Sequence, residues 1–99
     1  SYFEKIDVAI PLLLVLNELA TNSVKYAFTD QRFPEIVIKC ELEDNTALLS
    51  YVDNGKWVEG KKGFGLELID MLVEQIDGTI QRNSTEGGTQ FLIRFPHNS

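Results

Sequence analysis

The most informative stretch of the sequence is Glu18-Leu-Ala-Thr-Asn22-Ser-Val-Lys25-Tyr26-Ala-Phe28. At about 100° per residue in a helix, its carboxylate, carboxamide, ammonium and phenol groups fall within roughly a third of a turn of one another. A solvated helix surface usually repeats Glu, Lys and Arg in i,i+4 pairs and has no need of Asn, a poor helix former. The mixture therefore predicts a ligand-binding helix. Its opposite side is predicted to be apolar and consists of Leu12, Leu16, Leu19, Ala20, Val24 and Ala27.

The composition favours one small domain with a single core. The chain has 99 residues, of which 43% are hydrophobic, and this is too little for a second core. The net charge is −6 and the isoelectric point is near 4.6, whereas a nucleic-acid surface needs a basic stripe. We expect no nucleic-acid partner. An anionic ligand must be met by a few placed cations, backbone N–H groups or a metal.

The single cysteine, Cys40, excludes a disulfide framework and a cysteine zinc site. It lies in an alternating apolar pattern, so we expect a buried thiol. This usage fits a reducing compartment, and we expect a cytoplasmic domain in a protein that can carry a membrane anchor elsewhere. No stretch is expected to span or contact a membrane. The abrupt start and the short polar tail favour one domain, residues 1–99, taken from a longer chain.

The remaining sequence predicts helices that alternate with β-hairpins. The helix periods, the period-two runs and the turn residues between them define each element. In order, we expect an extended segment at 1–9, a helix from Pro11 to about Phe28 with the proline in its first turn, strands at 36–42 and 47–53, a glycine-rich loop at 55–65, a helix at 66–76 ended by Asp77-Gly78, and strands at 79–83 and 89–95. This order predicts an α+β fold, a two-layer α/β sandwich with a mixed, mostly antiparallel sheet and the helices on one face.

Two further clusters could serve the same ligand as the first helix. Gly63-Phe-Gly65-Leu66 opens a helix, where unpaired N–H groups and the helix dipole attract an anion such as phosphate. Asp53-Asn-Gly55 ends a strand, where a carboxylate can accept from an exocyclic amine. Lys25 could add positive charge, and Asn22 could hold a hydrated Mg²⁺. Taken singly, Gly63-Phe-Gly65 is more often a turn with a helix cap, Asp53-Asn-Gly55 is more often an ordinary turn, and Glu18 and Lys25 could be solvated surface.

Taken together, these stretches resemble the nucleotide boxes of sensor histidine kinases. Asn17-Glu-Leu-Ala-Thr-Asn22-Ser-Val-Lys-Tyr-Ala-Phe28 resembles the N box, nearest the subfamily that reads Asn-Glu-Leu-x-Thr-Asn. Asp53-Asn-Gly55, Gly63-Phe-Gly65-Leu66 and Gly87-Gly-Thr89-x-Phe91 resemble the other boxes in the right order. The resemblance covers about residues 6–95. It implies the Bergerat ATP-binding fold, shared by gyrase, heat-shock chaperones, histidine kinases and mismatch-repair proteins.

The resemblance implies ATP and Mg²⁺ as ligands and assigns roles on the phosphate side of the site. Asn22 would coordinate Mg²⁺ between the phosphates, and Lys25 would contact a phosphate. Gly63 and Gly65 would close a lid onto the phosphates, and Leu66 belongs to the same nucleotide-binding box. One further residue, Glu18, occupies the place of the general base in related ATPases.

On the base side, the resemblance gives each matching residue a contact with the nucleoside. Tyr26 would line the adenine and ribose pocket, and Asp53 would accept a hydrogen bond from the adenine amino group. Gly55 would leave room for the base. Thr89 would support Asp53 through a water.

The sequence departs from the family pattern in two places. The lid between Gly55 and Gly63 is short, and Trp57 stands where a further glycine is expected, so weak or altered nucleotide binding is one consequence. The only histidine, His97, lies in the terminal tail and is expected to be incidental. The phosphoacceptor would then lie on another domain.

The leading interpretation is the ATP-binding catalytic domain of a two-component sensor histidine kinase. It would transfer the γ-phosphoryl group to a histidine on a separate dimerisation domain of the same protein, which passes it to a response regulator. Autophosphorylation of this domain alone is not expected. Two alternatives stay open: a degenerate, non-catalytic interaction module of the same fold, and a serine kinase of the anti-sigma-factor type.

Overall fold

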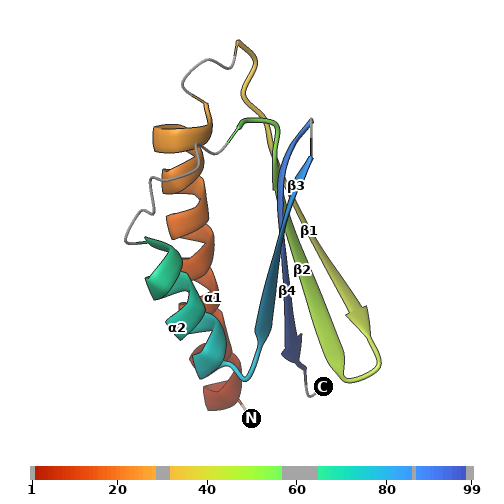
Figure 1. The fold of residues 1–99 in the computed structure, drawn as a ribbon. Coiled ribbons are helices and arrows are strands. Elements are labelled where there is room, and N and C mark those ends of the chain that lie inside the picture. Colours follow the sequence, from red (N-terminus) through yellow and green to blue (C-terminus); the bar gives the residue numbers. More distant parts are fainter. Residues whose placement is uncertain (1, 29–31, 57–64, 86, 98–99) are drawn as a thin grey trace.

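A layer of helices covers one face of a four-stranded sheet (Figure 1). The computed structural model describes residues 2–28, 32–56, 65–85 and 87–97. This architecture confirms the predicted α+β sandwich, and both hairpins and the second helix lie where the sequence pattern placed them. The elements are α1 (Tyr2–Asn22), the π-helix η1 (Ser23–Ala27), β1 (Ile36–Glu43), β2 (Thr46–Asp53), α2 (Gly65–Gln75), β3 (Thr79–Thr85) and β4 (Gly88–Pro96).

The strands are arranged in the order β1-β2-β4-β3. All three ladders are antiparallel, so the described sheet contains no parallel pair and is simpler than the mixed sheet expected. Strands β2 and β4 occupy the centre. In their register Asp53 lies opposite Thr89, which brings two of the predicted nucleotide boxes together at one end of the sheet.

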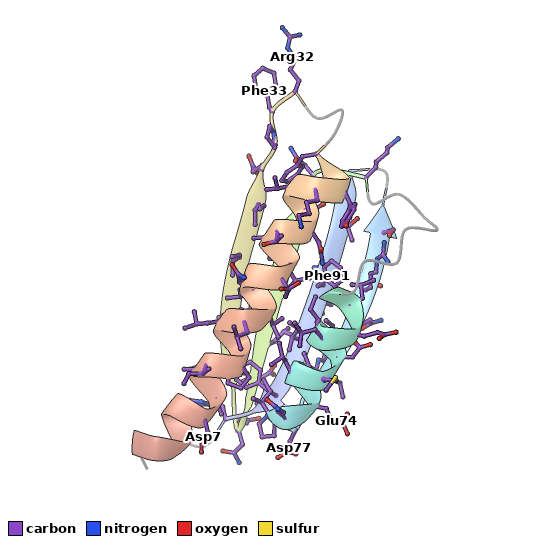
Figure 2. All side chains as sticks on the ribbon, turned by 90° about the vertical axis from the view of Figure 1, so that its left-hand side faces the viewer. Asp7, Arg32, Phe33, Glu74, Asp77 and Phe91 are labelled. Carbon is purple, nitrogen blue, oxygen red and sulfur yellow. The ribbon has the colours of Figure 1, made fainter. Side chains whose placement is uncertain are left out.

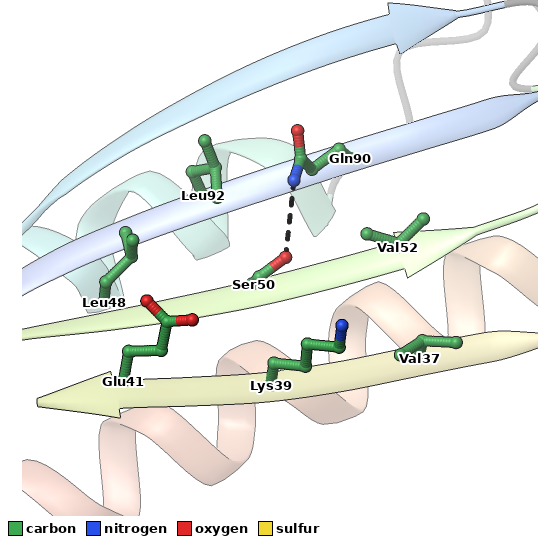
Figure 3. A pocket seen from close by; sticks show the side chains of 8 residues that line it. All are labelled: Val37, Lys39, Glu41, Leu48, Ser50, Val52, Gln90 and Leu92. Carbon is green, nitrogen blue, oxygen red and sulfur yellow. Dashed lines mark hydrogen bonds between the residues drawn. The ribbon is translucent and has the colours of Figure 1, made fainter.

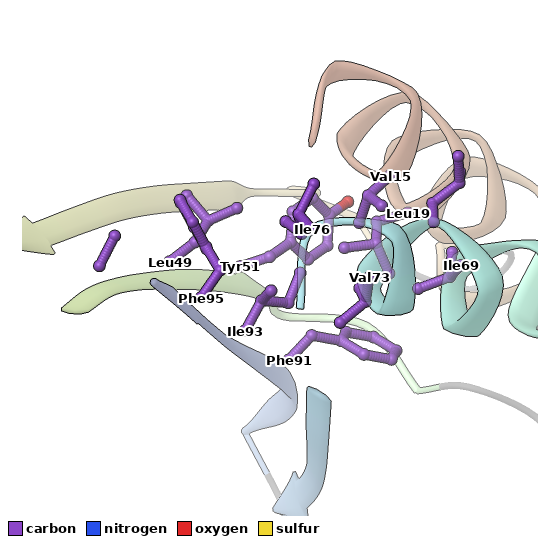
Figure 4. Close-up of a cluster of buried hydrophobic side chains, with 12 residues drawn as sticks. Val15, Leu19, Leu49, Tyr51, Ile69, Val73, Ile76, Phe91, Ile93 and Phe95 are labelled. Carbon is purple, nitrogen blue, oxygen red and sulfur yellow. The ribbon is translucent and has the colours of Figure 1, made fainter. Parts of the chain in front are cut away.

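The core lies between the helix layer and the two central strands (Figure 4). Along β2 and β4 every second side chain is buried, which is the period expected of a sheet with one covered face. Tyr51 and Phe91 are the largest fully buried side chains and meet edge to face, with ring centroids 6.3 Å apart. The buried cluster consists of Val15, Leu19, Ala47, Leu49, Tyr51, Ile69, Leu72, Val73, Ile76, Phe91, Ile93 and Phe95.

Two aspartates with positive φ mark the ends of elements. Asp44, in the turn between β1 and β2, has φ of 54°. Asp77, just after α2, has φ of 56°, and the N–H of Gly78 donates to the carbonyl of Val73 at 2.9 Å. Because a left-handed residue followed by such a bond is a common helix terminator, the predicted stop at Asp77-Gly78 is confirmed.

The extended segment predicted at residues 1–9 is wrong, because α1 begins at Tyr2 and contains Pro11. A proline inside a helix removes one backbone hydrogen bond and costs about 3 kcal/mol. Here Pro11 is buried and Val8, one turn earlier, packs against the core. The buried side of the helix therefore continues through the proline, and packing outweighs the lost bond.

The prediction that Val24 belongs to the apolar, core-facing side of the first helix is wrong, because Val24 is 66% exposed. The chain changes from α- to π-helix at Ser23, and the N–H of Phe28 donates to the carbonyl of Ser23 at 3.0 Å. A π-turn holds more residues than the 3.6 assumed in the helical spacing, so every later side chain points in a different direction. Ala27 remains buried as predicted.

The predicted burial of Cys40 is also wrong, since its thiol is exposed. Cys40 pairs with the buried Leu49, so its side chain does lie on the covered side of the sheet. The helix layer covers the central strands and leaves β1, at the edge, largely open: Ile38 and Leu42 on the same side are exposed as well. Alternation identified the face correctly but could not show where the cover ends.

The helical segment Asp7–Ala27 is long and apolar enough to cross a membrane by length and composition, contrary to our expectation that no stretch would be. Core helices of soluble domains pass the same test, and Val15 and Leu19 of this segment are fully buried in the core. Figure 2 shows this helix lying along the sheet, from Asp7 at one end to the turn bearing Arg32 and Phe33 beyond the other.

Candidate functional site

Asp53 is the centre of the candidate site. It is the last residue of β2 and is 0% exposed. Its neighbour across the ladder, Thr89, is 3% exposed. A buried carboxylate is costly unless hydrogen bonds compensate for the lost water, so Asp53 needs hydrogen-bond donors from the protein.

Both oxygens of Asp53 accept hydrogen bonds from nearby groups. The Ser23 hydroxyl donates to Oδ2 at 2.7 Å, and the backbone N–H of Gly55 donates to Oδ1 at 3.2 Å. Ser23 is itself fully buried and lies 2.7 Å from the Tyr51 hydroxyl. The carboxylate is therefore held in one orientation by η1 on one side and by its own turn on the other.

Burial raises the pKa of the Tyr51 hydroxyl above its ordinary value of 10.0. The hydrogen bond to Ser23 acts in the opposite direction, and the negative charge of Asp53 raises the pKa further. Desolvation is the largest of the three effects, as expected for a phenol that would have to ionise away from water. Tyr51 is therefore a neutral hydrogen-bond donor at physiological pH.

Two glycines are required by close backbone contacts around Asp53. Gly88 has φ of +148°, and a Cβ there would overlap the carbonyl oxygen of Asp53 and lie 2.9 Å from the Cα of Asn54. A Cβ at Gly55 would lie 2.6 Å from the carbonyl carbon of Ala27. These contacts place η1 and the start of β4 directly against the end of β2, which gives the two glycines a packing role whether or not a ligand binds.

Asn54 binds the loop before β1 rather than pointing toward the other candidate residues. Its side chain accepts from the N–H of Glu35 at 2.8 Å and donates to the carbonyl of Phe33 at 2.8 Å. Its backbone N–H also donates to the carbonyl of Glu35 at 3.2 Å. The segment Asp53-Asn-Gly55 thus contacts the residues before β1 through Asn54 and η1 through Gly55, while the side chain of Asp53 is buried.

The polar residues of the first helix lie at different depths. Asn22, the last residue of α1, is 5% exposed, and its Nδ2 is the one buried side-chain polar atom without a partner among the described residues. Glu18, one turn earlier, and Tyr26 are half-buried, whereas Lys25 is exposed. A buried amide without a partner costs free energy, and such an atom is a place where a ligand can bind.

The glycine box before the second helix is only partly within the described chain. Gly65 is the first residue of α2, and the side chain of Leu66 packs against the core. Gly63 and Trp57 lie outside the described residues, so the predictions that concern them stay predictions.

The described residues contain no group of three or more His, Cys, Asp and Glu side chains suited to hold a metal ion. Mg²⁺ does not require one, because it is commonly held by one or two protein oxygens together with substrate phosphates and water. The side-chain oxygen of Asn22 is the kind of ligand that Mg²⁺ prefers. Its Nδ2, which has no partner among the described residues, can only donate a hydrogen bond and would meet a phosphate or water oxygen. The proposed magnesium role of Asn22 is therefore chemically consistent with its surroundings.

The sequence interpretation missed two residues of this cluster, Ser23 and Tyr51. The sequence contains a signal for each of them. Ser23 follows Asn22 in the same motif. Tyr51 precedes Asp53 by two positions, which places the side chains of Tyr51 and Asp53 on one face of β2. The hydrogen bond between them depends on the π-helix, which no periodicity argument anticipates.

One cavity on the described surface lies on the opposite, uncovered face of the sheet (Figure 3). It measures about 440 Å³ and contains the hydrogen bond from Gln90 Nε2 to Ser50 Oγ, 3.4 Å long. It includes none of the predicted site residues. Its lining residues are Val37, Lys39, Glu41, Leu48, Ser50, Val52, Gln90 and Leu92.

Comparison with known proteins agrees with this geometry. Residues 7–99 match the family described as histidine kinase-, DNA gyrase B- and HSP90-like ATPases, and the chain belongs to this family. It is 33% identical over 89 residues to blue-light-activated histidine kinase 1 of Erythrobacter litoralis, an alignment that covers 84% of this chain and 25% of that protein. The chain thus spans about a quarter of the length of this curated relative.

Solved histidine kinase structures share the fold. The histidine kinase domain of the Erythrobacter litoralis EL346 blue-light-activated kinase superposes with a TM-score of 0.82 at 17% identity, covering 92% of this chain and 45% of that one. The catalytic domain of histidine kinase ThkA, in a nucleotide-free form, gives a TM-score of 0.72 at 19% identity, covering 88% and 66%. AdeS of Acinetobacter baumannii gives 0.74 at 21% identity, covering 90% and 47%. The fold is that of histidine kinase ATPase domains.

Proposed function

We propose that this chain is the ATP-binding catalytic domain of a sensor histidine kinase. The observation that carries the proposal is that residues from three of the predicted nucleotide boxes meet at the buried Asp53. Ser23 from the N-box stretch, Gly55 from the strand-end stretch and Gly88 from the last box all contact Asp53 or its backbone. Because the family consists of ATPases, the ligand we expect at Asp53 is adenine, whose amino group would donate to Oδ1.

The phosphates would lie toward the end of α1 and the start of α2. Asn22 would hold Mg²⁺ and exposed Lys25 would add positive charge, while the N-terminus of α2 at Gly65 would face the phosphate oxygens. When bound, Mg²⁺ neutralises phosphate charge. Tyr26 would line the pocket, Thr89 would support Asp53, and Gly63 and Leu66 would complete the glycine box.

We further propose that residues 1–99 form one domain of a longer cytoplasmic or membrane-anchored kinase. The γ-phosphoryl group would leave ADP and pass to a histidine nitrogen on a dimerisation domain of the same protein, and from there to a response regulator. Glu18 is half-buried one turn before Asn22, where it could accept the proton of the attacking nucleophile. This domain alone would bind nucleotide without phosphorylating itself.

Full burial of Asp53 favours a second candidate, a non-catalytic interaction module of the same fold. In that case the hydrogen bonds of Asp53 serve only folding, and no base reaches it. In the leading proposal, by contrast, side chains around Asp53 must move to admit the base. A serine kinase of the anti-sigma-factor type has no comparable support, since the relatives are named histidine kinases.

Calorimetric titration of the chain with ATP, with and without Mg²⁺, separates these candidates. We expect saturable binding that Asp53→Asn weakens by at least about tenfold, or about 1.4 kcal/mol, because the amide presents a donor where the base donates. Asp70→Asn, an exposed aspartate on α2, is the matched control and should change nothing. Absence of binding at millimolar ATP would favour the interaction module, and an unchanged ATP affinity in folded Asp53→Asn would contradict the proposed adenine contact.

A further inference from the structure

Three buried polar groups at the end of β2 form one hydrogen-bonded chain. Ser23 Oγ lies 2.7 Å from Tyr51 Oη and 2.7 Å from Asp53 Oδ2. All three residues are 0% exposed. Ser23 comes from η1, whereas Tyr51 and Asp53 come from one face of β2, so the chain exists only when the helix layer is packed on the sheet.

The direction of the protons along this chain is determined by valence. A serine hydroxyl has one proton, and the proton of Ser23 goes to the carboxylate of Asp53, which can only accept. The second contact of Ser23 must therefore be received, so Tyr51 donates to it. Burial keeps the pKa of Tyr51 above its ordinary value, which keeps that donor proton in place.

The consequence is that Asp53 is held as a pure hydrogen-bond acceptor. Oδ2 accepts the short 2.7 Å bond from the Ser23 hydroxyl of η1, whereas Oδ1 accepts a longer bond, 3.2 Å, from the N–H of Gly55. A ligand group that donates to Asp53 would join or replace the longer bond more readily than the shorter one. A ligand group that donates there is accepted. A group that presents an oxygen there places lone pairs against lone pairs, and burial prevents water from relieving the conflict.

We propose that Ser23 and Tyr51 are positioning residues that make Asp53 select a 6-aminopurine nucleotide over a 6-oxopurine nucleotide. This inference rests on the proposed function, since it assumes that a purine base reaches Asp53. Tyr51 acts through Ser23, and neither hydroxyl needs to touch the base. The selectivity belongs to the hydrogen-bonded chain rather than to the carboxylate alone.

The test compares the affinities of ATP and ITP, which differ at position 6 of the base, by calorimetry on the folded chain. We expect the wild type to prefer ATP by about a hundredfold. Ser23→Ala should reduce that preference about tenfold, because Asp53 loses the donor that orients its carboxylate and can turn. Tyr51→Phe should reduce it about threefold. Ser50→Ala, on the uncovered face, is the matched serine control and should leave it unchanged.

The double variant provides the decisive readout. If Tyr51 acts through Ser23, adding Tyr51→Phe to Ser23→Ala should change the ATP preference no further, whereas two independent structural effects would add. An unchanged ATP preference in Ser23→Ala, or additive losses in the double variant, overturns the inference while ATP binding itself stands.

If Ser23→Ala does not fold, Tyr51→Phe alone decides, and an unchanged preference there overturns the inference. A wild type that binds neither nucleotide overturns the proposed function with it.

Discussion

The two faces of the sheet differ, because the covered face carries the buried polar residues of the candidate site and the uncovered face carries a surface cavity. On the covered face, at the end of β2, Asp53 is fully buried and hydrogen-bonded to Ser23, while Asn22 Nδ2 has no partner in the part of the chain that the structure describes. On the uncovered face there is a cavity of about 440 Å³ whose charged side chains, Lys39 and Glu41, are exposed to water. The visible cavity therefore contains polar groups that need a ligand less than those around Asp53 do.

The difference indicates that buried polar groups identify a ligand-binding site better than a surface cavity does. Exposed Lys39 and Glu41 are satisfied by solvent and gain little from a ligand. Asn22, by contrast, is 5% exposed, and its amide nitrogen has no partner among the described residues. A ligand that accepted a hydrogen bond from it would remove the cost of a buried donor without a partner. We therefore expect substitutions on the covered face to have large, specific effects and those on the uncovered face to have small ones.

The largest effect on the free energy of unfolding is expected at Gly88, where the start of β4 contacts the end of β2. Gly88→Ala puts a Cβ against the carbonyl of Asp53 at a φ of +148°, so the chain should lose at least about 3 kcal/mol of unfolding free energy. Denaturant unfolding measures this. Gly87→Ala, at the exposed neighbouring glycine, should cost less than about 1 kcal/mol. Equal costs at the two glycines would mean that the close contact does not organise the covered face.

A smaller effect is expected from Tyr51 at high pH. Because its pKa in the folded chain is raised above 10.0, the unfolded chain ionises first. The contribution of Tyr51 to the free energy of unfolding is therefore fully present below pH 10. Above pH 10 it decreases by up to about 1.4 kcal/mol per pH unit, until the pH reaches the pKa of Tyr51 in the folded chain. Tyr51→Phe should remove this part of the pH dependence. Parallel stability curves for the two proteins between pH 9 and 11 would count against a buried phenol.

The sequence predicted most of the fold because its elements follow simple periods. The hairpin of β1 and β2, helix α2 and its stop at Asp77 were all placed correctly. The errors share a physical cause, since they arise where tertiary packing overrides a local rule. Pro11 lies within α1 because its neighbours pack, and Cys40 is exposed because the helix layer ends before β1.

The candidate site was predictable as a set of segments but not as a geometry. Order along the chain indicated that Asn22, Asp53 and Thr89 belong together, and the register of β2 with β4 brings Asp53 opposite Thr89. The hydrogen bonds from Ser23 were not predictable, because the π-turn after Asn22 determines where the Ser23 hydroxyl points. Sequence spacing carries no information about that local change of helix type.

The smallest effect is expected from Ser50→Ala, the same chemical change as Ser23→Ala made on the other face of the same sheet. Ser50 is half-buried, and its one described side-chain bond, from Gln90, is long at 3.4 Å. Water can replace that bond on an open face, so unfolding free energy should change by less than about 0.5 kcal/mol. ATP affinity should not change, because β2 lies between this hydroxyl and Asp53's partners. A loss of ATP affinity in Ser50→Ala would place the binding site on the uncovered face, and the cavity there would then be the better guide after all.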